Sequence, residues 1–150
     1  DSYHIVYNET LRDRICAVSN KTHYNEMNVL SMHALIGAYQ PQGYEWVDEL
    51  NQVLAGNIEY FCDYVDEHFG GVSYSRPQGT YMVFLDCTEW CREHGRDIQW
   101  LLDEGARVGV GYQDGRPFHG PCHIRVNLAL PLSRVREACD RLDRYVFNAR

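Results

Sequence analysis

Apolar residues recur at helical spacing through the first half of the chain. This periodicity predicts a helix over about 8–20, capped by its first residue, and a second over about 25–38 that Pro41 stops. A third and longer helix is predicted over 44–68, because the apolar positions keep a period near 3.6 residues until two glycines at 70–71. The apolar positions that indicate these helices include Leu11, Ile15, Val18, Met27, Leu30, Leu35, Trp46, Leu50, Ile58, Phe61 and Val65.

Short strands separated by turn residues are predicted in the second half. Residues 72–74 and 80–86 flank a turn at 75–79, and another strand is expected at 107–110. The chain also opens on a strand-like run at 3–7. The second half is therefore expected to contain a small sheet.

Two further helices accompany these strands. Asp97 is expected to cap a short helix that Gly105 closes, and Ser133 is expected to cap the last helix. The predicted fold class is α+β, a small and mostly antiparallel sheet covered by helices. Residues 1–40 are expected to form the edge of another domain, and residues 41–150 a small domain of their own.

A β-branched, apolar run surrounds a single arginine, Arg125. On a strand, Ile124, Val126 and Leu128 share one face, and Arg125 and Asn127 share the other. A planar guanidinium suits a carboxylate held by two parallel hydrogen bonds, and a partly buried one is costly without such a partner. The residues alone leave two interpretations of Arg125 open: a binding site for a carboxylate ligand, or a structural ion pair with one of the 21 acidic residues.

Composition narrows the classes of function. A net charge of -7 with scattered arginines makes nucleic acid an unexpected partner. No segment approaches the roughly 20 apolar residues of a membrane span, so no membrane association is expected. Six cysteines without a secretory signal favour reduced thiols in a cytoplasm. The chain has no initiating methionine and is expected to be a piece of a longer protein.

Cysteine and histidine side chains near two turns offer potential zinc ligands. Their spacing contains no paired Cys-x2-Cys knuckle, so free thiols are favoured and no metal is expected. The residues concerned are Cys87, Cys91, His94, His119, Cys122 and His123.

The order of four motifs resembles the C-terminal part of fold-type I enzymes that depend on pyridoxal 5′-phosphate (PLP). Within that class the chain is most similar to cystathionine β-lyases of the MalY/PatB type, which share the class I/II aminotransferase architecture. The resemblance covers essentially the whole chain. The motifs are the runs at 39–50 (YQPQGYEWVDEL), 56–57 (GN), 77–86 (PQGTYMVFLD) and 125–129 (RVNLA).

The resemblance implies roles for several side chains. Arg125 matches the arginine that binds the α-carboxylate of the amino-acid substrate. Asn127, on the same face, either braces that guanidinium or is simply solvated. The loop at 109–120 corresponds to one near the substrate entrance, where Gly111 and Tyr112 are expected to line the cavity.

The resemblance also implies PLP in the intact enzyme, and a Schiff-base lysine to hold it. Lys21 follows the predicted strand at 3–7, whereas the family's lysine precedes the matching strand. The catalytic lysine is therefore expected upstream of Asp1, in an N-terminal domain absent from this chain. The chain alone is expected to hold no cofactor and to be inactive, and the intact enzyme is expected to be a homodimer.

Three functions remain open at this point. The first is a carbon–sulfur β-lyase acting on cystathionine or a related cysteine conjugate. The second is a class I/II aminotransferase of the same superfamily. The third is a non-catalytic amino-acid-binding domain, which a missing lysine before Asp1 would favour.

Overall fold

The computed structural model describes residues 4–24 and 26–149. It contains two compact units, Asp1–Glu49 and Leu50–Arg150, which are described separately below. The predicted opening strand is wrong for residues 4–7, which form no strand, and Tyr3 lies outside the described residues.

The first unit contains two short helices and the beginning of a long one. Asn8 caps α1 (Glu9–Thr22) as predicted, since its side-chain oxygen accepts the N–H of Leu11 at 2.9 Å. The second helix begins later than predicted. Asn28 caps α2 (Val29–Ala38) by accepting the N–H three residues further on at 2.8 Å.

The apolar stripe of α1 is exposed. Leu11, Ile15 and Val18 leave 52, 41 and 62% of their surface accessible. Sequence periodicity predicts that these side chains are buried, but a 49-residue unit is too small to enclose a core of its own.

The long helix α3 (Pro41–His68) begins at the proline that was predicted only to end the helix before it. Proline suits the first position of a helix, because its missing N–H would have had no partner there. Gly71 follows the helix with a φ of +80°, in agreement with the predicted left-handed residue.

The second unit contains the predicted antiparallel sheet. Its four strands have the order β1-β2-β4-β3, and every neighbouring pair is antiparallel. The fold class is therefore α+β, as predicted. The strands are β1 (Ser73–Tyr74), β2 (Met82–Asp86), β3 (Gln113–Asp114) and β4 (His123–Asn127).

The helices of the second unit differ from the prediction in three places. A helix not predicted from the sequence, α4 (Thr88–His94), follows β2. Asp97 caps α5 (Ile98–Arg107) as predicted, but the helix continues through Gly105, so the predicted strand at 107–110 is wrong. Ser133 is not a cap either, because α6 (Leu132–Leu142) begins after Pro131 without a side-chain cap, and it continues into a π-helical turn (Asp143–Phe147).

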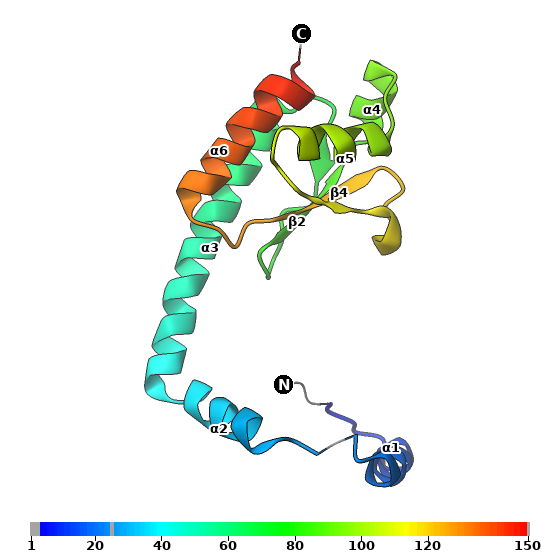
Figure 1. The fold of residues 1–150 in the computed structure, drawn as a ribbon, viewed down its shortest axis with the longest axis vertical. Coiled ribbons are helices and arrows are strands. Elements are labelled where there is room, and N and C mark those ends of the chain that lie inside the picture. Colours follow the sequence, from blue (N-terminus) through cyan, green and yellow to red (C-terminus); the bar gives the residue numbers. More distant parts are fainter. Residues whose placement is uncertain (1–3, 25, 150) are drawn as a thin grey trace. The chain divides into compact units, whose positions relative to one another are not determined.

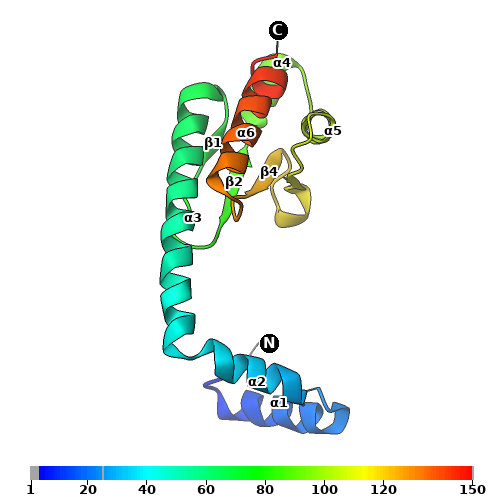
Figure 2. The ribbon, with the colours of Figure 1, turned by 60° about the vertical axis from the view of Figure 1, so that its left-hand side comes forward.

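Among the described elements, α-helices cover one face of the sheet and leave the other uncovered. Figures 1 and 2 show the C-terminal part of α3 and α6 side by side against the sheet. Helix α5 contacts β4 and the turn that follows α6. Strand residues that alternate along β2 and β4 join side chains from these helices in one buried cluster. The strand members are Val83, Leu85, Ile124 and Val126, and the helix members include Phe61, Val65, Leu101, Val135 and Leu142.

Three cysteines in this core are predicted to resist thiol reagents in the native protein. Cys62, Cys87 and Cys139 have no accessible surface. Burial raises the pKa of Cys139 to about 12 and also raises the pKa of Cys62 and Cys87, so their reactive thiolate forms are scarce at neutral pH.

Alkylation at pH 8, read residue by residue with mass spectrometry, checks this expectation. The three cysteines should stay unmodified until denaturant is added. The exposed Cys16 of the same chain is the comparison residue and should be modified without denaturant. Rapid native labelling of any of the three would contradict the described core.

Candidate functional site

The uncovered face of the sheet carries Arg125 at its centre. Arg125 lies in the middle of β4, directly opposite Phe84 of β2 and Gln113 of β3. Its neighbours Ile124 and Val126 are buried on the opposite face, so the alternation predicted from the sequence is confirmed. Arg125 therefore lies on the face opposite the core, where its side chain is half-buried.

Arg125 has no acidic partner among the residues that the structure describes. Every ion pair found within 4.0 Å in this part of the chain involves other side chains. The guanidinium carbon instead lies 4.5 Å from the centre of the Phe118 ring. A structural ion pair, the alternative interpretation of Arg125, is therefore not formed here.

Asn127 lies at the exposed end of β4. Its side-chain oxygen accepts the backbone N–H of Ala129 at 2.8 Å, which shapes the turn after the strand. Asn127 thus shares a face with Arg125, but its side chain bonds to the backbone of Ala129.

Gly111 is exposed, whereas Tyr112 is half-buried. A side chain at Gly111 would meet no atom within 4 Å. The Tyr112 hydroxyl donates a hydrogen bond to the carbonyl of Leu101, and a Cβ on Gly105 would lie 2.5 Å from the tip of the Tyr112 ring. Burial of Tyr112, first of all, raises the pKa of its phenol. Tyr112 therefore packs on α5, and Gly105 is inside that helix because only glycine permits this approach.

A histidine beside Arg125 forms a second contact region on the same face. The His123 ring packs against the Phe84 ring, tilted by 33° with ring centres 4.6 Å apart, and its Nε2 lies 3.8 Å from a carboxylate oxygen of Asp86. Its Nδ1 is buried without a hydrogen-bond partner among the described residues. Partial burial tends to raise the pKa of Asp86, but hydrogen bonds from Thr88 and the nearby His123 outweigh this effect and lower it.

Sequence reasoning missed Phe84, His123 and Phe118 as neighbours of Arg125. The sequence did contain a signal for His123, because period-2 alternation places it on the same face as Arg125. Phe118 carried no such signal, since it lies in a 3-10 turn (Arg116–Phe118) within a segment predicted only as a loop.

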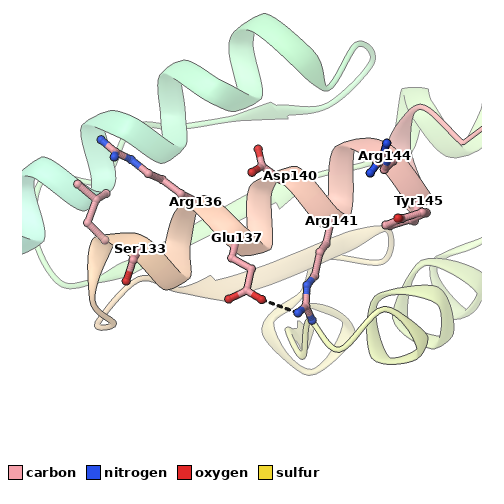
Figure 3. A pocket seen from close by; sticks show the side chains of 8 residues that line it. Ser133, Arg136, Glu137, Asp140, Arg141, Arg144 and Tyr145 are labelled. Carbon is pink, nitrogen blue, oxygen red and sulfur yellow. Dashed lines mark hydrogen bonds and ion pairs between the residues drawn. The ribbon is translucent and has the colours of Figure 1, made fainter.

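A shallow hollow runs along α6 and its π-helical turn (Figure 3). Arg141 donates to Glu137 across it, while Arg136 stacks on Tyr60 and Arg144 on Tyr145. Its charged groups thus already have partners within the chain. The lining residues are Leu132, Ser133, Arg136, Glu137, Asp140, Arg141, Arg144 and Tyr145, which include none of the predicted site residues.

The described residues provide no group of three or more side chains suited to a metal ion, and all six cysteines are free thiols. Among the same residues, no helix combines the length and apolar character needed to cross a bilayer.

The residues of this chain do not fit PLP as a cofactor site. The cofactor requires a lysine amine, a carboxylate at the pyridine nitrogen and donors for the phosphate. Lys21 is the only lysine, and it lies exposed on the last turn of α1. Within the described part of the chain, no hydrogen bond or ion pair connects Lys21 to an acid.

Known proteins resemble this chain in sequence and in structure. No family model matches the chain. It is 35% identical over 124 residues to a putative cystathionine β-lyase of Mycobacterium leprae, a match that covers 72% of this chain and 30% of that protein. The chain thus spans less than a third of the length of this curated relative.

Solved structures show the same architecture. A PLP-bound putative aminotransferase from Clostridium difficile 630 superposes with a TM-score of 0.80 at 22% identity, over 93% of this chain and 35% of that one. A PLP-bound C–S lyase from Staphylococcus hominis gives 0.77 at 23% identity, over 93% and 36%.

The fold is therefore that of the C-terminal region of fold-type I PLP-dependent enzymes, as the motif order predicted. In sequence, the chain is related to proteins named putative cystathionine β-lyase.

Proposed function

We propose that this chain is the C-terminal part of a PLP-dependent carbon–sulfur β-lyase and that Arg125 binds the α-carboxylate of its amino-acid substrate. The observation that supports this most directly is an arginine without an acidic partner on the uncovered sheet face. A guanidinium in this position presents parallel donors to a carboxylate. Sequence relatives named putative cystathionine β-lyase favour a substrate of that class.

In this proposal, residues 1–40 belong to the edge of a large N-terminal domain, and residues 41–150 form the small domain. The large domain would hold PLP, and a lysine encoded before Asp1 would form its Schiff base. Asn127 and Gly111 would lie near the bound substrate. Tyr112 would support the same region by packing on α5 rather than by offering its hydroxyl. The intact enzyme would be a homodimer, and residues 1–150 alone would be inactive.

A second candidate is a class I/II aminotransferase. It is favoured by the likeness to the putative aminotransferase from C. difficile, whose TM-score of 0.80 is similar to the value of 0.77 for the C–S lyase. Both candidates use a carboxylate-binding arginine, so the sheet face by itself does not separate them.

An assay of the full-length protein separates the candidates. Purified protein is supplied with PLP and L-cystathionine, with and without 2-oxoglutarate, and both pyruvate and glutamate are measured. A β-lyase should release pyruvate without the keto acid. Glutamate formation without pyruvate would instead indicate the aminotransferase. If neither pyruvate nor glutamate forms but the protein binds an amino acid, the result would favour the non-catalytic binding domain.

A further inference from the structure

The ring of Phe118 lies under the Arg125 guanidinium carbon. We propose that Phe118 is a positioning residue, which holds the guanidinium flat and thereby orients its N–H groups toward a carboxylate. This inference rests on the proposed function of Arg125 as the carboxylate-binding residue.

The position of Phe118 under the guanidinium carbon explains how it acts without accepting from the donors of Arg125. The guanidinium carbon lies 4.5 Å from the ring centre, a cation–π distance. Stacking uses the face of the planar guanidinium and leaves the N–H groups at its edge available. A long arginine side chain loses rotamer freedom when it binds, and a side chain already held in place loses less.

The turn that carries Phe118 is closed by backbone hydrogen bonds. The N–H of Phe118 donates to the carbonyl of Gly115 at 2.9 Å, and the N–H of Gly115 donates to the carbonyl of His123 at 2.9 Å. His123 precedes Arg125 by two residues on β4. The ring and the guanidinium are thus attached to the same strand.

Side-chain contacts of Arg116 also hold the start of the turn. The Nε of Arg116 donates to a carboxylate oxygen of Asp114 at 2.8 Å, and its Nη2 donates to the side chain of Gln99 in α5 at 3.0 Å. The hydrogen bond from Arg116 lowers the pKa of Asp114, which favours the charged form of this carboxylate. The turn is therefore connected to both β3 and α5.

Two buried glycines allow the turn to lie directly on the sheet. A Cβ on Gly115 would come within 2.5 Å of the His123 carbonyl oxygen, and one on Gly120 within 2.5 Å of the Phe84 ring. Any other residue at either position would push the turn away from the strand. This close approach keeps Phe118 at the height of Arg125.

Kinetics of the full-length protein with L-cystathionine tests the inference. Phe118→Leu should raise KM about three- to ten-fold while kcat changes less than two-fold, because the stacking orients a binding group. Phe118→Tyr, which keeps an aromatic face, should restore KM. Tyr145→Leu is the matched control, because Tyr145 is 45% exposed against 47% for Phe118 and also lies under an arginine, but outside the site.

A double-mutant cycle distinguishes positioning from general structural support. Added to Arg125→Ala, the Phe118→Leu change should cause no further loss of kcat/KM, since its effect passes through the guanidinium. A full additional loss in that background, or an unchanged KM in Phe118→Leu alone, would overturn the inference. If Phe118→Leu does not fold, Phe118→Met replaces it in the same cycle.

The cycle also separates this inference from the function on which it rests. Unchanged kinetics in Arg125→Ala would overturn the role of Arg125 and the inference together. A large loss in Arg125→Ala with none in Phe118→Leu would overturn the inference only.

Discussion

Replacing Arg125 with alanine is expected to lower kcat/KM for an amino-acid substrate by about 10²- to 10³-fold. Removing one partner of a buried, hydrogen-bonded charge pair costs about 2–5 kcal/mol, and the expected loss of about 3–4 kcal/mol lies within that range, since each 1.4 kcal/mol is a factor of ten. Arg125→Lys should recover only part of the activity, because an ammonium lacks the fork that holds both carboxylate oxygens.

The fold should survive this substitution, because Arg125 forms no ion pair with any described residue. The free energy of unfolding is expected to change by less than about 1 kcal/mol. Arg134→Ala is a suitable control, since Arg134 is an exposed arginine on α6 that pairs with Glu137 at 2.8 Å. Steady-state kinetics of the full-length protein supplies the measurement, and an unaltered kcat/KM would exclude Arg125 from the site.

Replacing Asn57 with alanine is expected to have the largest effect on stability of any single polar change. Asn57 is 1% exposed, and its amide donates to the carbonyl of Leu128 at 2.9 Å and of Leu130 at 2.8 Å. It therefore connects α3 to the segment that leads from β4 into α6. In the variant, the carbonyl of Leu128 keeps a second donor, the N–H of Leu130. The carbonyl of Leu130 loses its hydrogen bond from Asn57.

The expected loss is about 2–3 kcal/mol, because two hydrogen bonds of about 1 kcal/mol each are lost and a small cavity is left. Asn51→Ala, at an exposed position of the same helix, isolates the gain in helix propensity and should change stability by at most about 0.5 kcal/mol. Urea unfolding followed by circular dichroism measures both variants. Equal stabilities of the two would mean that the amide of Asn57 does not hold the connection.

Local patterns of the sequence predicted the elements whose cause is local. Asn8 and Asp97 both cap helices as expected, because a cap depends on a side chain and an N–H only three residues away. The placement of Arg125 opposite a buried face was also predictable, since strand alternation has a strict period of two. The motif order further indicated the fold class, which the solved structures confirm.

Long-range packing explains the errors. Gly105 resembles a helix end in sequence, but it lies inside α5 because the Tyr112 ring packs against it. Ser133 resembles a cap, yet α6 begins one residue earlier, after Pro131. In both cases the local residues were compatible with two helix boundaries, and packing against distant residues selected one of them.

The sequence by itself determined the alternating faces of β4, the caps of α1 and α5 and the presence of an arginine in need of an anion, because each depends on residues close in the chain. Only the tertiary structure decided that no described acid reaches Arg125 and that the Phe118 ring contacts its guanidinium instead. The reason is physical: the turn bearing Phe118 is held against β4 by contacts of Gly115 and Gly120, which no local periodicity encodes.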